Sequence, residues 1–243
     1  MEDLIREINL DDIVVLEVGT GRGGTTEKLV ELLSHYPAAK LITTDIIGRH
    51  FSTIRDRISD TSVHIEFIKT DALELEGISP QSVDLVVCNY TLCAISSRSG
   101  AEMLALEKFY HVLKPGGHLY IEEELPINLT KNEAQDIFRF KWEILRSLEY
   151  LLGQMTYREF EPEILDKLCQ ISGFQDININ QSSEFYDGVD SLEFFERRVN
   201  NYLRQLDNIH LDQGFAKLVN EIKAKVQQTG GMEIPYYTLT ARK

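Results

Sequence analysis

Short apolar segments rich in β-branched residues recur along the first half of the chain, and helical patterns separate them. The segments are IVVLEV, KLITTDI, HIEFIKT, VDLVVCN and HLYIEE. Between them the spacing predicts helices at about 24–35, 49–58 and 100–113. Apolar strands that alternate with helices form a parallel sheet covered on both faces. The pattern therefore predicts a doubly wound α/β fold, which binds ligands at the carboxyl ends of its strands.

The regular alternation of strand and helix patterns ends after residue 122. Thr130 followed by Glu133 forms a capping-box pattern, which predicts the start of a long helix that ends at Gly153. Pro162 marks the first turn of another helix. The remaining segments predict a strand (FQDININ), two amphipathic helices (about 190–207 and 212–229) and a last strand (IPYYTLTAR).

These segments together predict a mostly parallel, seven-stranded sheet with helical insertions after strand 5 and between strands 6 and 7. We expect a single domain over residues 1–243, with the insertions at about 125–170 and 184–231. Both insertions carry apolar faces, which must pack on other elements. One hypothesis is a cap over the strand ends that shapes a substrate pocket, and the alternative is ordinary helical layers of the fold.

The formal net charge of −14 bears on possible partners. An acidic field repels phosphate backbones, so nucleic acid is disfavoured as the main partner, whereas a cationic or neutral substrate suits it. The chain has no run of about 18 apolar residues, so the sequence predicts no membrane span. The acidic start, MEDLIREINLDD, does not resemble a signal peptide. Three cysteines at spacings that suit neither disulfides nor zinc, and no His/Asp/Glu spacing typical of a metal site, favour a reduced, cytoplasmic protein.

The segment IVVLEVGTGRGGTT carries the most informative pattern. Gly19, Gly21 and Gly24 satisfy G-x-G-x-x-G, the dinucleotide pattern, while Gly19, Gly21 and Gly23 satisfy G-x-G-x-G. Glu17 decides between them, because a carboxylate about 4 Å from a pyrophosphate costs on the order of 4 kcal/mol at an effective dielectric of about 20. S-adenosylmethionine has no phosphate and carries an ammonium and a sulfonium, so Glu17 would attract it. The turn is therefore predicted not to bind phosphate.

Six segments in chain order resemble the motifs of class I S-adenosylmethionine-dependent methyltransferases. They are LEVGTGRG, TTDI, IKTDALEL, VDLVVCNYTLCAI, ALEKFYHVLKPGGHLYIEE and LDKLCQISGFQDINI. The resemblance covers the first 122 residues and the last strand. It implies a Rossmann-like fold and transfer of a methyl group from S-adenosylmethionine by direct in-line displacement.

The resemblance also implies which residues hold the methionine end of the cofactor. Glu17 would serve this end directly or through water. The backbone at Gly19, Gly21 and Gly23 would lie beneath the methionine and the ribose. Asn89, at the end of strand 4, would reach the methionine part.

A second group would hold the nucleoside. Asp45 would grip the two ribose hydroxyls, since a carboxylate has two acceptor oxygens. Ile46 would pack on the adenine. Asp71 would accept from the adenine amino group, and Ala72 would offer its backbone N–H. The alternative for Asp45 is a helix cap, and the alternative for Asp71 is a closed turn.

The methyl acceptor is less clearly indicated, and no catalytic residue is assigned. The segment NYTL lacks the Pro-Pro of the Asn-Pro-Pro-Tyr motif, so amino methylation of nucleobases or glutamine is not supported. Tyr90 lies where the resemblance places the acceptor, and Glu123 or Glu124 would face it as a base or cation partner unless they form a solvated strand end. Aromatic residues in the insertions are expected to be core or to line a pocket: Trp142, Tyr157, Tyr186, Phe194 and Phe195.

Four functions remain under consideration. The leading one is a methyltransferase acting on a small molecule. A protein methyltransferase is the alternative within the same family. An NAD-binding oxidoreductase is supported by the overlapping G-x-G-x-x-G and by an acid 21 residues beyond Gly24. A non-catalytic sensor of S-adenosylmethionine is the fourth. The sequence leaves the oligomeric state open.

Overall fold

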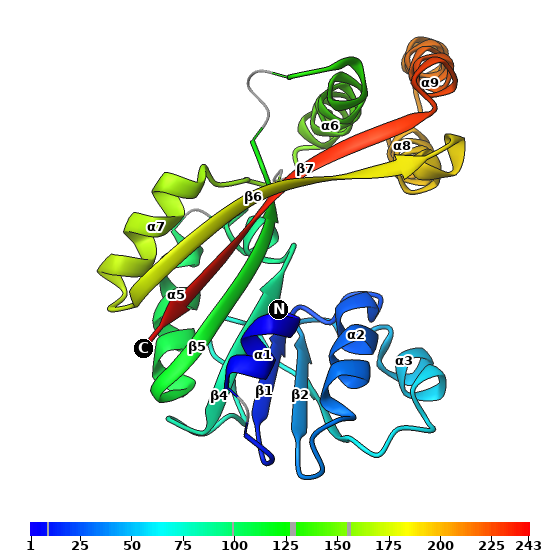
Figure 1. The fold of residues 1–243 in the computed structure, drawn as a ribbon. Coiled ribbons are helices and arrows are strands. Elements are labelled where there is room, and N and C mark those ends of the chain that lie inside the picture. Colours follow the sequence, from blue (N-terminus) through cyan, green and yellow to red (C-terminus); the bar gives the residue numbers. More distant parts are fainter. Residues whose placement is uncertain (9, 99, 127–129, 155–156) are drawn as a thin grey trace. The chain divides into compact units, whose positions relative to one another are not determined.

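The structure is a computed structural model that describes residues 1–243 apart from 9, 99, 127–129 and 155–156 (Figure 1). The described chain divides into two compact units. Unit 1 comprises Met1–Glu123, Glu159–Asn180 and Thr238–Lys243, and unit 2 comprises Glu124–Arg158 and Gln181–Tyr237. Each unit is therefore assembled from separate segments of the chain.

The described strands form one seven-stranded sheet in the order β3-β2-β1-β4-β5-β7-β6. The strands are β1 Val14–Val18, β2 Lys40–Asp45, β3 His64–Lys69, β4 Val83–Asn89, β5 Leu113–Glu124, β6 Gln175–Asp187 and β7 Gly231–Arg242. Neighbours among β1 to β5 pair in parallel. The end of β7 meets the start of β5, where Lys243 N–H donates to Gly117 O at 2.9 Å, so β7 runs antiparallel to it. The predicted, mostly parallel sheet is confirmed.

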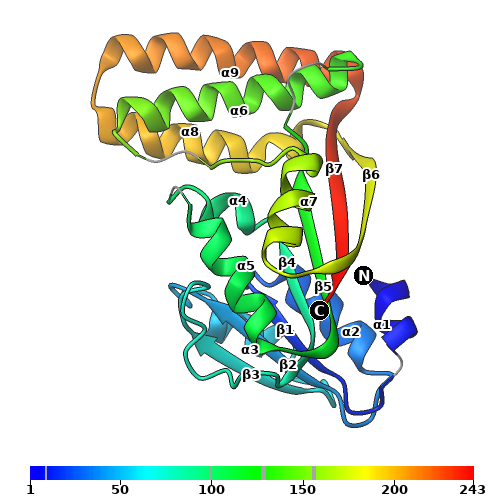
Figure 2. The same ribbon diagram turned by 90° about the vertical axis from the view of Figure 1, so that its left-hand side faces the viewer.

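Helices cover both faces of the sheet in unit 1. They are α1 Glu2–Ile8, α2 Gly24–Leu33, α3 Phe51–Arg57, α4 Leu92–Ile95, α5 Ala101–Val112 and α7 Pro162–Ile171. Helices α1 and α2 share a core with alternate residues of β1 and β4, including Val15 and Val87. Figure 2 shows α5 and α7 on the other side of these strands. Val86 and Val87, which point to opposite faces, are both fully buried, as the doubly wound prediction requires.

Unit 2 contains three longer helices, α6 Glu133–Leu151, α8 Glu193–Leu206 and α9 Ile209–Thr229, with the short 3₁₀ helix η1 Val189–Leu192 before α8. Figure 2 shows α6, α8 and α9 side by side. Their apolar faces meet in one core that includes Leu145, Phe195, Val199 and Ile222. The helical insertions are thus confirmed as elements, and their role as a cap stays a prediction.

The start of α6 differs from the sequence prediction. The helix begins at Glu133, and its N-cap is Asn132, whose Oδ1 accepts from Gln135 N–H at 2.9 Å. The Thr130 hydroxyl instead bonds to Asp136 Oδ1 at 2.5 Å. The capping box at Thr130 is therefore wrong. Asparagine is as good an N-cap as threonine, so two candidates this close together cannot be separated by pattern alone.

Candidate functional site

The glycine turn between β1 and α2 is a left-handed stretch of backbone. Gly19, Gly21 and Gly23 have φ angles of +86°, +52° and +93°, values that side chains other than glycine rarely adopt. A Cβ on Gly19 would lie 2.1 Å from the Oγ1 atom of Thr91. At Gly21 the nearest atom to such a Cβ is 3.9 Å away. The turn therefore packs against Thr91 at one glycine and leaves space at the next.

Gly19→Ala should destabilise the protein more than Gly100→Ala does. The φ angles are +86° and +83°, but a Cβ at Gly100 meets nothing within 4 Å. In both variants the alanine must adopt a left-handed backbone conformation, which costs free energy of folding. Only Gly19→Ala adds a steric clash, which we expect to lower the free energy of unfolding by roughly a further 1–2 kcal/mol. Urea unfolding of both variants measures the difference, and equal midpoints would contradict the close approach to Thr91.

Glu17, in β1 just before the turn, is buried, with 1% of its surface exposed. Its Oε2 accepts from Thr26 Oγ1 at 2.7 Å and from Thr43 Oγ1 at 2.6 Å. Oε1 is buried and has no hydrogen-bond partner among the residues that the structure describes. Burial raises the pKa of Glu17 above its ordinary value, against the two hydroxyls, which lower it. The carboxylate is thus positioned by two threonines and retains one unused acceptor.

Asp45 connects the tip of β2 to the glycine turn. Its Oδ2 accepts from Gly21 N–H at 3.1 Å, and its Oδ1 accepts from the N–H groups of Ile47 and Gly48 at 2.8 and 2.9 Å. Ile46 follows with 55% of its surface exposed. A charged acceptor and an exposed apolar side chain therefore stand next to each other beside the turn.

Asp71 lies just beyond β3 and forms an ion pair that the sequence analysis missed. Arg98 Nη1 donates to Asp71 Oδ2 at 2.7 Å, and Arg98 Nη2 donates to Oδ1 at 3.0 Å. Oδ1 also accepts from Leu73 N–H at 3.0 Å. The Arg98 guanidinium holds the pKa of Asp71 below its ordinary value. Ala72 beside it is half-buried. No signal in the sequence links residues 71 and 98, because a loop after β4 brings them together.

Asn89 and Tyr90 end β4 next to the turn. Asn89 Nδ2 donates to Thr25 Oγ1 at 3.3 Å, while its Oδ1 is buried without a hydrogen-bond partner in the described part of the chain. Tyr90 is 43% exposed and has a φ angle of +48°, with its N–H bonded to Glu122 O at 2.7 Å. A left-handed backbone in a residue other than glycine costs about 1–3 kcal/mol and is typical of functional sites.

The two glutamates at the end of β5 have different surroundings. Glu123 is fully buried, and its Oε1 accepts from the N–H groups of Leu92 and Cys93 at 2.7 and 3.2 Å, which ties it to the start of α4. Glu124 belongs to unit 2, where its charge acts on Lys141. These contacts favour a role for Glu123 in positioning α4.

Oxygen acceptors dominate the strand ends of unit 1: Glu17, Asp45, Asp71 and the Asn89 amide. Two of their buried oxygens, Glu17 Oε1 and Asn89 Oδ1, have no hydrogen-bond partner in the chain as described. Such a set suits a ligand that brings N–H and O–H donors and a positive charge, and it repels phosphate. S-adenosylmethionine, with its ammonium, ribose hydroxyls and adenine amine, fits it.

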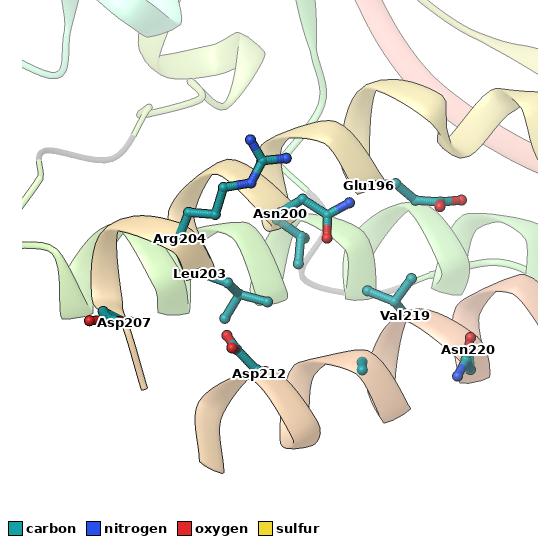
Figure 3. A pocket seen from close by; sticks show the side chains of 10 residues that line it. Glu196, Asn200, Leu203, Arg204, Asp207, Asp212, Val219 and Asn220 are labelled. Carbon is teal, nitrogen blue, oxygen red and sulfur yellow. The ribbon is translucent and has the colours of Figure 1, made fainter. Parts of the chain in front are cut away.

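Within the described residues, no group of three or more His, Cys, Asp and Glu side chains is arranged to hold a metal ion. None of the described helices combines the length and apolar character needed to cross a membrane. A groove of about 500 Å³ lies between α8 and α9, and in Figure 3 Asp212 points from α9 toward Leu203 while the Arg204 guanidinium extends away from it. None of its lining residues is among those expected to bind the cofactor.

Comparison with known proteins agrees with this geometry. A family model described as "Methyltransferase domain" matches residues 15–117. The ubiquinone/menaquinone biosynthesis C-methyltransferase UbiE of Pseudomonas fluorescens (strain Pf0-1) is 30% identical over 129 residues, which cover 52% of this chain and 48% of UbiE. The match therefore spans about half the length of that relative.

Two solved structures illustrate the fold. The YcgJ protein of Bacillus subtilis is similar with a TM-score of 0.63 and 14% identity, over 99% of this chain and 96% of YcgJ. Phosphoethanolamine N-methyltransferase 2 of Haemonchus contortus, in complex with phosphomonomethylethanolamine and S-adenosylhomocysteine, has a TM-score of 0.59 and 16% identity, over 99% of this chain and 51% of that one. The family match shows a methyltransferase domain over residues 15–117, and the sheet order and the solved structures show the class I, Rossmann-like fold of S-adenosylmethionine-dependent methyltransferases.

Proposed function

We propose that the protein transfers a methyl group from S-adenosylmethionine to a small-molecule acceptor by direct in-line displacement. The observation that carries the proposal is the glycine turn after β1 together with Glu17, Asp45 and Asp71, which lie at the ends of the neighbouring strands β1, β2 and β3. When bound, the cofactor supplies a methyl group on a sulfonium, which is a good leaving group. The chain then needs chiefly to hold and align the two reactants.

The methionine end is assigned to Glu17 and Asn89. Glu17 Oε1 and Asn89 Oδ1 are buried acceptors without a partner in the described residues, and leaving such groups unpaired costs about 1–3 kcal/mol each. An ammonium group offers three N–H donors. We therefore assign these two oxygens to the ammonium, above the backbone of Gly19, Gly21 and Gly23.

The ribose is assigned to Asp45. A carboxylate has about four lone-pair sites, and three backbone N–H groups occupy three of them. The remaining site is on Oδ2, where the bond from Gly21 is the longest of the three. A bidentate grip on both hydroxyls would therefore need the Gly21 N–H to give way, and Oδ2 is the atom we assign to the first hydroxyl.

Asp71→Ala should weaken binding of S-adenosylhomocysteine by about three- to tenfold, which corresponds to the free energy of about one hydrogen bond. Arg98 and Leu73 fill three acceptor sites of Asp71 and leave one on Oδ2 for the adenine amine. Arg98→Ala should change affinity by less than about threefold, since the ion pair is partly exposed. Calorimetry on both variants tests this. A larger loss with Arg98→Ala than with Asp71→Ala would show that Arg98, not Asp71, contacts the adenosine.

The acceptor is assigned to the neighbourhood of Tyr90. Its exposed ring and left-handed backbone at the end of β4 support a role in orienting the acceptor. A general base is needed only if the nucleophile is protonated at the working pH. We therefore assign Tyr90 to positioning the acceptor, and we assign Glu123 to holding the start of α4.

Calorimetric titration with S-adenosylmethionine and S-adenosylhomocysteine tests cofactor binding, and no heat at high micromolar cofactor would refute the proposal. Incubation of the protein with methyl-labelled cofactor and a size-fractionated cell extract tests the acceptor class. Label in the filtrate is the expected result. Label retained with large molecules would instead support the protein methyltransferase alternative.

A further inference from the structure

A lysine is buried in the helical core of unit 2. Lys141 of α6 has 5% of its surface exposed. Its ammonium lies 4.5 Å from the ring centre of Phe138 and 5.1 Å from that of Trp142. It forms no ion pair or hydrogen bond with any residue that the structure describes. Cation–π contacts offset part of the cost of burying a charge, yet lysine is almost never buried this far unless it is paired.

A second buried donor lies beside it. The Nε1–H of Trp142 is buried and has no acceptor within the described ranges. The Trp142 ring stacks edge-on with Phe138 and Tyr157, with centroids 6.5 and 6.2 Å apart. An indole N–H only donates, as does an ammonium. Two adjacent donors thus stand in an aromatic cluster.

Glu149, on the same helix, uses one carboxylate oxygen for other donors. Glu149 Oε1 accepts from Arg198 Nη2 at 2.5 Å and from Tyr202 OH at 2.8 Å. Burial, and to a lesser extent Arg198, lowers the pKa of Lys141, while the charge of Glu124 raises it. An added negative charge next to Lys141 would favour its charged form.

We propose that Lys141 and Trp142 form a binding site in unit 2 for the anionic oxygen group, a carboxylate or phosphate, of a small molecule with an apolar or aromatic body. The ammonium supplies charge, the indole supplies a directed N–H, and Phe138 and Tyr157 supply the apolar surround. The chain as a whole carries a net charge of −14, so an anionic ligand needs such a local cation. Anion binding at this site does not depend on the proposed function.

Trp142 is the only tryptophan in the chain, so its fluorescence reports directly on this site. The full chain, without cofactor, is titrated with two anions, benzoate and phenyl phosphate. Benzyl alcohol and benzylamine serve as the neutral and cationic control ligands of similar shape. We expect a saturable change in emission near millimolar concentration for one or both anions and none for the control ligands. The stronger anion identifies carboxylate or phosphate. No saturable response to either anion, or an equal response to benzyl alcohol, overturns the proposal.

Lys141→Met keeps the length of the side chain and removes the charge. It should lower the affinity for the anion at least tenfold and raise the thermal midpoint, because a buried unpaired ammonium is replaced by an apolar group. Lys217→Met, at an exposed position of α9, should change neither. If Lys141→Met is not folded by circular dichroism, Lys141→Gln is measured in its place with the same expectation. Wild-type affinity in the folded variant overturns the site, and since no cofactor is present, this result is separate from any failure to bind S-adenosylhomocysteine.

Discussion

Asp45→Ala should weaken binding of S-adenosylhomocysteine by roughly 10- to 150-fold, about 1.5–3 kcal/mol for a charge-assisted hydrogen bond. Asp45 is the carboxylate that joins β2 to the glycine turn, and its Oδ2 has the remaining acceptor site. The variant would lose the proposed ribose contact and would also release the N–H groups of Gly21, Ile47 and Gly48. Calorimetry at fixed pH and salt measures the effect.

Two control variants separate these effects. Asp45→Asn keeps an oxygen for Ile47 and Gly48 but loses the charge, so its affinity should fall between those of wild type and Asp45→Ala. Glu66→Ala removes an exposed carboxylate of β3 that pairs with Lys40 and should leave affinity unchanged. If Asp45→Ala bound as tightly as wild type, the ribose would have to be held elsewhere.

Glu17→Gln should have opposite effects on binding and on stability. We expect affinity for S-adenosylhomocysteine to fall at least about tenfold, since the ammonium loses a charged, buried partner. We also expect the thermal midpoint without ligand to rise by a few degrees, because the variant removes a buried charge with an unpaired oxygen. Thr26 and Thr43 can still donate to the amide oxygen. Calorimetry and thermal unfolding measure the two effects.

The stability gain should depend on pH. Burial raises the pKa of Glu17 in the folded state above its ordinary value of 4.5. A protonated Glu17 favours folding, so this stability is fully present below about pH 4.5 and is lost as the pH rises through the raised pKa. The advantage of Glu17→Gln should therefore be small at pH 4.5 and grow toward neutral pH. Glu27→Gln, which removes an exposed carboxylate paired with Arg57, should show no such trend. A gain that is constant with pH would contradict the burial argument.

The sequence predicted the sheet and the glycine turn well, because both depend on local rules. Continuous apolar strands are required where both faces are covered, as at Val86 and Val87. The three glycines fall where φ is positive. The first helix and the helix after β4 were not predicted, since helices of seven and four residues are too short to show a period.

Contacts between distant segments could not be predicted from the sequence. The pairing of Arg98 with Asp71 needs the loop after β4 to reach the end of β3. Alternation along β5 does not indicate that Glu123 turns to the amides of α4. Lys141 looks like a surface residue in the sequence, and only the packing of α6 against its neighbours shows it among aromatic rings. The roles of the cofactor residues stay predictions until the variants are measured.

Unit 2 is built from two separate chain segments, and unit 1 from three. During synthesis, α6 emerges from the ribosome well before α8 and α9, with which it shares its core. Unit 1 likewise lacks residues 238–243 until after the helical unit has been made. Unit 1 therefore cannot be completed until all of unit 2 has been translated, and the apolar face of α6 lacks α8 and α9 for part of that interval, which favours binding by chaperones.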